Sequence, residues 1–437
     1  MKRFMAILLA AALSAGILAG CGTNTASSSS TATAGETTKA AAGATTTAAA
    51  TTAAATDTTA AAQKKNIVLW YYWETESHQT ALGEVIKQFN DSQPNITVEA
   101  KYVPFADFKK QLSIGTAAAE LPDMVIIDNP DHAAYAAMGI FADITGKIDL
   151  SQYYDGPVAS CTLDGKLYGV PFGSNCLALY YNEDMLAAAN CKVPTTWAEL
   201  ADVAKKTSVG KVSGFGFSSL QNEEGTFNFL PWLNEAGTTA YKINNEAGIK
   251  AITYISDLVK NGAMTKEVIN WTQGDTMNQF ISGNLAMMIN GPWQVPTMRE
   301  QAPDLKWNVA LIPTDGADGV KATGLGGENF AIIDNANQDA SLAFIKFATS
   351  ADEVKTYIDK FGYIASRKDV SSTQYADDKV MQLFIDAMQY AVARGPSAQW
   401  PEISDAISLA FNEAITETAT PAEAAAKAQT TIDSIVG

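Results

Sequence analysis

An alternation of strand-like and helix-like runs begins near residue 66, and it constrains the fold more than any other feature. The apolar run 66–72 is typical of a buried strand, and apolar residues then recur at helical spacing over 81–89. An alternating strand at 96–102, a helix at 105–119 and a short apolar strand at 124–127 follow. This order predicts a parallel sheet covered by helices. In such sheets, ligands lie beyond the carboxyl ends of the strands.

The rest of the chain continues the α/β pattern and becomes rich in helix toward its end. A strand is expected at 177–181, and Thr196 with Glu199 forms a capping-box signature at the start of a helix. Roughly 370 residues follow position 64, which is too long for one typical core and predicts two domains. Helices are expected in the final third at 340–349, 352–361, 379–392, 403–418 and 421–435.

The N-terminus reads as an export signal. Lys2 and Arg3 precede an apolar run over 4–18, which is shorter than the roughly 20 apolar residues of a spanning helix. The run ends in Leu-Ala-Gly before Cys21, and this arrangement resembles a bacterial lipobox. The resemblance implies that residues 1–20 are a lipoprotein signal peptide and that Cys21 carries a lipid after cleavage. The alternative is an ordinary signal peptide with a chance cysteine.

A low-complexity segment separates Cys21 from the folded part. Residues 23–62 are almost entirely Thr, Ala, Ser and Gly, with no large apolar side chain. Such a segment cannot bury enough surface to offset the entropy of ordering it. We therefore expect 21–63 to consist of the lipidated cysteine and a disordered tether.

Charge and composition exclude several classes of partner. The formal net charge is −17, and removal of Lys2 and Arg3 with the signal takes it to −19. An acidic chain argues against nucleic acid and makes an anionic substrate less favourable. The two histidines, His78 and His132, are far apart and have no zinc-site spacing to cysteine. We expect no metal and no cofactor.

Three cysteines remain in the mature chain beside Cys21, namely Cys161, Cys176 and Cys191. Because three is an odd number, they can form one intramolecular disulfide at most. Export permits such a bond without demanding it. The alternative is that all three are small buried hydrophobes.

Short motifs are spread over the folded part, and their order along the chain resembles that of a known family. Together they resemble the extracellular solute-binding proteins of ABC importers, in particular the maltose-binding-like family that takes sugars. The segments that carry the resemblance are 67–73, Leu-Pro-Asp-Met-Val at 121–125, Asp-Gly-Lys-Leu-Tyr-Gly-Val-Pro at 164–171, Tyr-Tyr-Asn-Glu-Asp-Met-Leu at 180–186, Pro-Thr-Thr-Trp at 194–197, Ala-Met-Met-Ile-Asn-Gly-Pro-Trp at 286–293, Gly-Gly-Glu-Asn at 326–329 and Pro-Ala-Glu-Ala-Ala at 421–425. Each segment is weak alone, and their collinear order is what makes the resemblance specific.

The resemblance implies a two-lobed, periplasmic-binding-protein-like α/β fold with hinge crossings and a solute held between the lobes. It places lobe 1 at 64–174 plus 328–375 and lobe 2 at 175–327 plus 376–437, with crossings near 171–177 and 321–328. It also implies a monomer anchored by its lipid to the outer face of the cell membrane, which delivers a carbohydrate to the permease subunits of an ABC importer. Hinge closure around the ligand is the expected motion.

Sugar chemistry selects the candidate aromatic contacts. Aromatic planes cover the apolar C–H faces of a sugar, while carboxylates, amides and Arg bond its hydroxyls. The resemblance points to Trp232, Trp293 and Trp400, and Trp73 ends the first strand. For Trp232, in a very apolar run, core burial is the alternative. Trp70 and Trp197 are interpreted as structural.

The polar candidates lie at strand ends and crossings. Glu74 follows the first strand, and Asp128 with Asn129 ends the third. The alternative for Asp128 and Asn129 is a turn, which Asn129-Pro130 would also explain. Asn175 lies in the first crossing. The remaining candidates are Glu328, after two glycines that let backbone approach a ligand, and Arg367.

The sequence is compatible with three functions. The first is the binding component of a sugar importer, without catalysis. The second is a surface-anchored glycoside hydrolase, which needs two carboxylates about 5–9.5 Å apart across a cleft. The third is a binder of a non-sugar solute such as glycerol phosphate, which calls for convergent Arg and Lys. Because the candidate residues are mostly acidic or aromatic, the first function is favoured.

Overall fold

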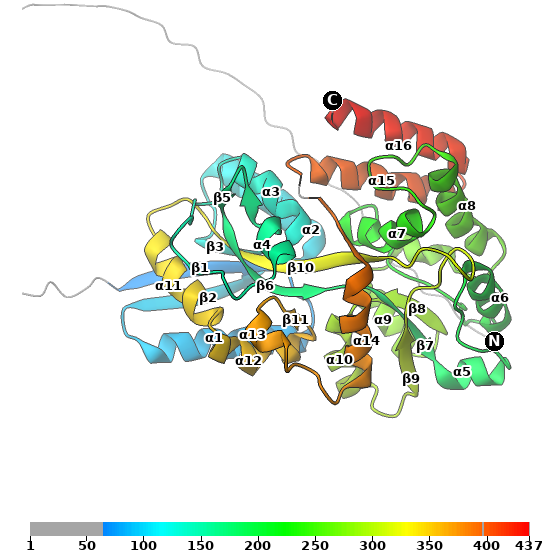
Figure 1. Cartoon of the computed structure of the whole chain (residues 1–437), viewed down its shortest axis with the longest axis horizontal. Helices are drawn as coiled ribbons and strands as arrows, with labels where there is room; N and C mark the ends of the chain where they lie inside the picture. The colour runs from blue at the N-terminus through cyan, green and yellow to red at the C-terminus, as the bar shows by residue number, and fades with distance from the viewer. Residues whose placement is uncertain (1–63, 396, 437) are drawn as a thin grey trace, which may run out of the picture. The chain divides into compact units, whose positions relative to one another are not determined.

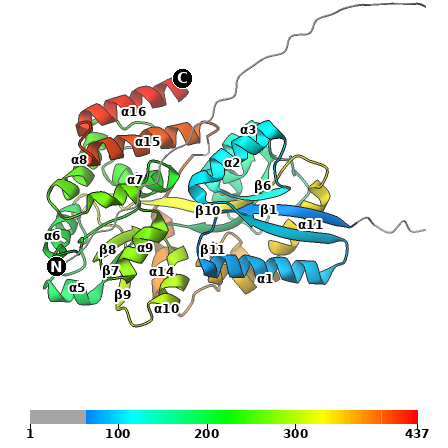
Figure 2. The same cartoon turned by 180° about the vertical axis from the view of Figure 1, so that it is seen from behind.

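The computed structural model describes residues 64–395 and 397–436, and Figures 1 and 2 show it from opposite sides. The expected signal peptide and tether lie outside the described residues. In the described part, two β-sheets are each covered by helices. No helix among these residues is long and apolar enough to cross a bilayer.

The larger sheet has the strand order β11-β6-β10-β3-β1-β2, and β12 pairs with β10 off this path. The strands β2, β1 and β3 are parallel, which confirms the parallel arrangement predicted for the first three strands. β10 runs antiparallel to both β3 and β6, so the complete sheet is mixed. Its strands are β1 (Lys65–Tyr71), β2 (Ile96–Tyr102), β3 (Met124–Asp128), β6 (Gly169–Asn175), β10 (Thr323–Ile332), β11 (Ile364–Ala365) and β12 (Ala391–Ala393).

Helices cover both faces of this sheet, with α2 and α3 on one side and α1 and α12 on the other (Figures 1 and 2). Helix α1 buries the apolar stripe expected from its spacing, and Phe89 at its end packs edge-on against Phe344. The elements around the sheet are α1 (Glu76–Ser92), α2 (Phe105–Ala118), α3 (Asn129–Ala137), α4 (Asp155–Ser160), α11 (Gln338–Ala348), α12 (Ala351–Tyr357), η3 (Ile358–Phe361), α13 (Lys368–Ser371) and the hairpin of β4 (Thr162–Leu163) with β5 (Lys166–Leu167).

The smaller sheet is antiparallel, with the order β8-β7-β9. Helix α6 beside it begins with the predicted capping box of Thr196 and Glu199. The elements of this part are β7 (Ala178–Asn182), β8 (Met287–Asn290), β9 (Trp307–Ala310), α5 (Glu183–Ala188), α6 (Trp197–Thr207), α7 (Glu223–Glu235), α8 (Glu246–Lys260), η1 (Lys266–Asn270), α9 (Gln273–Ile281), η2 (Pro292–Gln294), α10 (Val295–Gln301), α14 (Lys379–Ala387), η4 (Met388–Tyr390), α15 (Trp400–Ile415) and α16 (Pro421–Val436).

Two segments that pass between the sheets are fastened to each other. β6 of the larger sheet ends at Asn175, and β7 of the smaller sheet begins three residues later at Ala178. In the gap, Leu177 N–H donates to Thr323 Oγ1 at 2.9 Å, and that hydroxyl donates to the Leu177 carbonyl oxygen at 2.9 Å. Thr323 is the first residue of β10, so both crossings are held at one point.

The structure differs from the sequence prediction in one helix, and it decides between the alternatives for the cysteines. The helix expected at 379–392 ends at Ala387, because residues 391–393 instead pair with β10 and satisfy their backbone groups in the sheet. Among the described residues, Cys161, Cys176 and Cys191 are free thiols, and the first two are buried. The alternative of small buried hydrophobes therefore holds for Cys161 and Cys176, while Cys191 is only half-buried.

Candidate functional site

A cavity of about 670 Å³, its open mouth included, lies where the two sheets and their helices meet. One wall comes from the ends of β1, β3 and β10, and the facing wall from α7, α9 and η2. The lining combines aromatic side chains with carboxylates and amides; the carboxylates are Glu74, Asp128, Glu223, Glu224 and Glu328.

Aromatic rings line both walls of this cavity. Trp293 and Phe227 stack with ring centroids 6.2 Å apart and planes 25° apart. A Cβ at Gly291 would lie 1.8 Å from the Trp293 ring, so only glycine there leaves room for the indole. On the facing wall, Trp73 donates its Nε1–H to Tyr363 Oη at 3.1 Å. Both walls thus present flat apolar surface beside polar groups.

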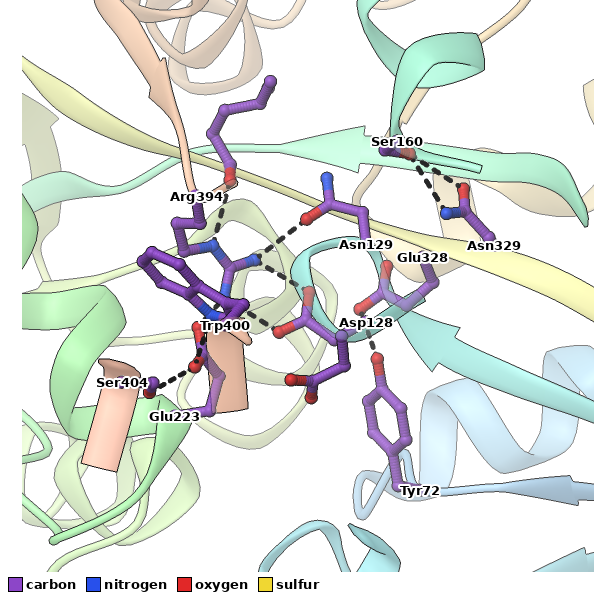
Figure 3. A network of polar contacts seen from close by, with 12 residues as sticks. Tyr72, Asp128, Asn129, Ser160, Glu223, Glu328, Asn329, Arg394, Trp400 and Ser404 are labelled. Carbon is purple, nitrogen blue, oxygen red and sulfur yellow. Dashed lines mark hydrogen bonds and ion pairs between the residues drawn. The ribbon is translucent and has the colours of Figure 1, made fainter. Parts of the chain in front are cut away.

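Arg394 lines the cavity and is the centre of a polar network (Figure 3). Its guanidinium donates to both carboxylate oxygens of Asp128, at 2.8 and 2.7 Å, and to Glu223 Oε1 at 2.7 Å. It also donates to the Leu325 carbonyl at 3.1 Å and to Asn129 Oδ1 at 3.4 Å. A guanidinium has five N–H donors, and these five bonds therefore use its full donor capacity.

Glu223 joins this network to the helices of the smaller sheet. It is the first residue of α7 and is 1% exposed. Besides Arg394, it accepts from Trp400 Nε1 at 2.9 Å and from the Ser404 hydroxyl. A carboxylate in the first turn of a helix is favoured by the helix dipole. Asp128 lies at the end of β3, so the network connects the two sheets through Arg394.

Glu328 faces the cavity from β10, opposite Asp128 in the antiparallel register. Its Oε1 accepts from the Tyr363 hydroxyl at 2.8 Å and from the Tyr72 hydroxyl at 3.3 Å. Burial, together with the negative charge of Asp128, raises the pKa of Glu328 to about 8. This carboxyl therefore exchanges its proton near neutral pH.

Two further titratable groups line the cavity. Burial lowers the pKa of His78 to about 4, so its ring is neutral at physiological pH and donates Nε2–H to the Phe361 carbonyl at 3.1 Å. Burial also raises the pKa of Glu224 to about 7, and the neighbouring charge of Glu74 acts in the same direction. The cavity therefore offers carboxyl groups and neutral rings.

The structure brings six of the ten sequence-predicted residues to the cavity: Trp73, Glu74, Asp128, Asn175, Trp293 and Glu328. They come from segments up to 255 positions apart in the chain, from Trp73 to Glu328. Their convergence makes them candidates for ligand contact.

The other four predicted residues, Asn129, Trp232, Arg367 and Trp400, do not line this cavity. Trp232 is fully buried against Trp197, Phe215 and Tyr254, because helix α7 turns that face toward the core. Trp400 is also fully buried, and its indole N–H donates a hydrogen bond to Glu223.

Asn129 and Arg367 are the other two predicted residues outside the lining. Asn129 begins α3, and its side chain accepts from Arg394. Arg367 donates to both carboxylate oxygens of Asp369 and to the Thr349 carbonyl, and its guanidinium lies over the Tyr153 ring. Three of its five N–H donors therefore bond to groups of the larger-sheet part.

Sequence reasoning missed several members of the site, among them Tyr72, Glu223, Phe227, Gln294, Tyr363 and Arg394. Tyr72 and Gln294 had a signal, since they are adjacent to Trp73 and Trp293. The other four of these residues occur in segments without a motif. Within residues 64–395 and 397–436, no cluster of His, Cys, Asp and Glu could hold a metal ion.

Comparison with known proteins identifies relatives of the whole folded part. A family model described as bacterial extracellular solute-binding protein matches residues 84–382. The lactose-binding protein of Rhizobium radiobacter is 26% identical over 316 residues, which cover 67% of this chain and 73% of the relative.

Solved structures share the fold. An ABC transporter solute-binding protein from Thermotoga lettingae, bound with α-D-tagatose, has a TM-score of 0.79 and 26% identity, covering 86% of this chain and 100% of that chain. The GacH receptor of Streptomyces glaucescens, solved without ligand and with acarbose, has a TM-score of 0.76 and 26% identity, covering 85% and 98%. These likenesses confirm the predicted two-lobed α/β fold class.

Proposed function

The chain belongs to the bacterial extracellular solute-binding protein family, and from this membership we propose that it captures a carbohydrate in the cavity between the two sheets. The resemblance found in the sequence is thereby confirmed at the level of the family. The proposed role is to deliver the sugar, an oligosaccharide in our interpretation, to the permease subunits of an ABC importer. The sugars bound by the relatives support a carbohydrate ligand.

One observation carries the proposal: stacking faces and oxygen acceptors converge in a single cavity with walls from both lobes. Trp293 and Phe227 present rings from one wall, and Trp73 and Tyr72 from the other. A carbohydrate has both apolar C–H faces and hydroxyl donors, so it can use both kinds of surface at once. We propose as ligand contacts the predicted residues that line the cavity, joined by Tyr72, Phe227 and Tyr363.

A thermal-shift screen of the purified protein tests the proposal. The panel contains lactose, maltotriose, mannobiose, tagatose and acarbose, with glycerol 3-phosphate as the non-sugar alternative. A ligand at 100 times its dissociation constant adds about 2.7 kcal/mol to the free energy of unfolding. For roughly 370 folded residues this raises Tm by about 3–4 °C. If glycerol 3-phosphate alone raises Tm, the carbohydrate proposal is wrong.

We further propose that the protein binds its sugar without transforming it. Its relatives are named as binding proteins, which supports this reading. The competing glycoside hydrolase is tested by incubating a bound oligosaccharide with the protein and separating the products by chromatography. Recovery of the intact sugar is expected, and accumulation of shorter sugars would establish the hydrolase instead.

The anchoring and lobe boundaries are also proposals. We propose lipidation at Cys21, a tether over 21–63, and attachment to the outer face of the cell membrane as a monomer. Lobe 1 would comprise 64–174 plus 328–375, and lobe 2 would comprise 175–327 plus 376–437. The gap between β6 and β7, at residues 176 and 177, lies two residues beyond the first of these boundaries, since Asn175 still pairs with Gly326 in the larger sheet.

A further inference from the structure

We propose that Asn175, Gln294 and Glu328 form an acceptor triad that selects sugars by their hydroxyl donors and makes the cavity reject anionic sugars. The inference rests on the proposed carbohydrate-binding function and specifies the residues that read the ligand. It also predicts which chemical derivatives of one sugar the protein can take.

The triad consists of three buried oxygen atoms that have no hydrogen-bond partner within the described part of the chain. They are Asn175 Oδ1, Gln294 Oε1 and Glu328 Oε2, on residues that are 3%, 1% and 6% exposed. All three residues line the same cavity. A buried acceptor without a partner raises the free energy of the folded protein. A ligand that donates a hydrogen bond to it therefore gains more binding free energy than it would from an exposed contact.

Neighbouring contacts fix the direction of each member. Tyr72 and Tyr363 both donate to Glu328 Oε1, which leaves Oε2 free. Gln294 donates its Nε2–H to the Gln273 carbonyl at 3.4 Å. Its amide oxygen is therefore the atom left for a ligand.

The third member depends on a glycine. A Cβ at position 326 would lie 2.0 Å from Asn175 Oδ1, so glycine there leaves space for the amide. Residue 326 is the register partner of Asn175 across β10 and β6. The same sheet pairing that connects the lobes thus places this acceptor.

The three acceptors also come from different parts of the molecule. Glu328 lies in β10 of the larger sheet, Asn175 ends β6 at the first crossing, and Gln294 lies in η2 beside the smaller sheet. A sugar that satisfies all three must therefore contact both walls.

Anionic sugars find no available cation in this cavity. Arg394 is the one permanently charged base among the lining residues, all of which the structure describes, and its five donors already have partners. His78 is neutral. A uronate, sulfate or phosphate group would instead lie among the acidic side chains Glu74, Glu223 and Glu224, and those that are ionised and not paired with Arg394 repel it.

Glu328 adds a pH signature to the triad. Its carboxyl faces the Tyr72 and Tyr363 hydroxyls and the charges of Asp128 and Arg394, and burial raises its pKa to about 8. A sugar hydroxyl that donates to Oε2 stabilises the ionised carboxylate, so binding releases a proton below that pH. Sugar affinity should therefore rise as the pH increases from 6 to 8.

The test uses the full chain and the sugar of the panel that raises Tm most, measured by calorimetry. Asn175→Leu and Gln294→Met remove neutral acceptors and should each weaken binding about 2- to 10-fold. Glu328→Gln should weaken binding about 10- to 100-fold when it is measured above pH 8, where the Glu328 carboxyl is mostly ionised. Asn175→Asp keeps an oxygen at that position and should retain most of the affinity.

Glu235→Gln is the matched control. Glu235 Oε1 is likewise a buried acceptor without a partner in the described residues, but it lies in the core and not in the cavity. Its substitution should leave sugar affinity unchanged. Circular dichroism of every variant shows whether it is folded. For a triad position whose variant does not fold, the binding of monodeoxy derivatives of the sugar to the unsubstituted protein tests the proposed contact instead.

Monodeoxy derivatives of the same sugar assign each hydroxyl. Three of these derivatives should bind the unsubstituted protein more weakly than the parent sugar. In the variant that lacks the matching acceptor, the same derivative and the parent sugar should bind equally. The uronate derivative should bind at least about 100-fold more weakly than the neutral sugar.

The outcomes separate the two proposals. If no sugar binds, the carbohydrate function itself fails. If a sugar binds but the triad variants behave like Glu235→Gln, or the uronate binds equally well, the triad is wrong while the function stands. An affinity that stays flat between pH 6 and 8 would overturn donation to Glu328.

Discussion

Replacement of Arg394 by methionine is the most informative perturbation of this fold. The methionine side chain fills much of the same volume but donates no hydrogen bond. It leaves Asp128 and Glu223 facing each other in a cavity wall where they are 7% and 1% exposed. Removal of one partner from a buried ion pair costs about 3–5 kcal/mol, because the remaining charge is uncompensated.

The expected shift follows from the size of the protein. Unfolding entropy is about 2.1 cal/mol/K per residue, or roughly 0.8 kcal/mol/K for the roughly 370 folded residues. A loss of 3–5 kcal/mol therefore lowers Tm by about 4–6 °C, measured by calorimetry at pH 8.

The pH dependence of this loss has a defined sign. Burial already raises the pKa of Asp128 while Arg394 lowers it, so removing Arg394 raises that pKa further. Protonation then relieves the uncompensated charge, and the Tm deficit should shrink as the pH falls from 8 to 5.

Arg299→Met is the matched control, because Arg299 makes the same two-bond contact with Asp378, at 2.7 and 2.8 Å, on the surface. With half of the Arg299 side chain in solvent, the pair contributes at most about 1 kcal/mol, or about 1 °C. Equal losses in the two variants, or a deficit for Arg394→Met that grows at low pH, would refute the reasoning.

Three further predictions follow from the structure and the sequence. Trp293→Ala should weaken sugar binding by about 1–3 kcal/mol in calorimetry and lower the ligand-free Tm less than Trp70→Ala does; unchanged affinity would place Trp293 outside the binding surface. Because the pKa of Glu328 is raised from 4.5 to about 8, its contribution to stability is complete below pH 4.5 and is lost by pH 8, up to about 5 kcal/mol. Glu328→Gln should therefore reduce the decline of Tm over that range, and an unaltered decline would contradict the assignment. Cys21→Ala should abolish partitioning into a detergent phase while sugar binding persists, and equal partitioning would argue against lipidation.

Local patterns in the sequence were sufficient for the first elements of the larger sheet, from β1 to β3. The apolar run at β1, the helical spacing of α1 and the alternation in β2 depend only on neighbours in the chain, so their periodicity is readable without a structure. The capping box of Thr196 and Glu199 is equally local. Candidates at strand ends, such as Trp73 and Asp128, followed from the rule that ligands lie beyond parallel strands.

Only the tertiary structure could decide which side chains complete the site. Arg394 and Asp128 are 266 positions apart, and Arg394 reaches the cavity because a three-residue strand pairs with β10 instead of continuing a helix. Trp232, Trp293 and Trp400 look alike in sequence, yet only Trp293 lines the cavity, while the other two are fully buried away from it. The direction in which such a ring points depends on how its element packs against distant ones, and no local pattern records that packing.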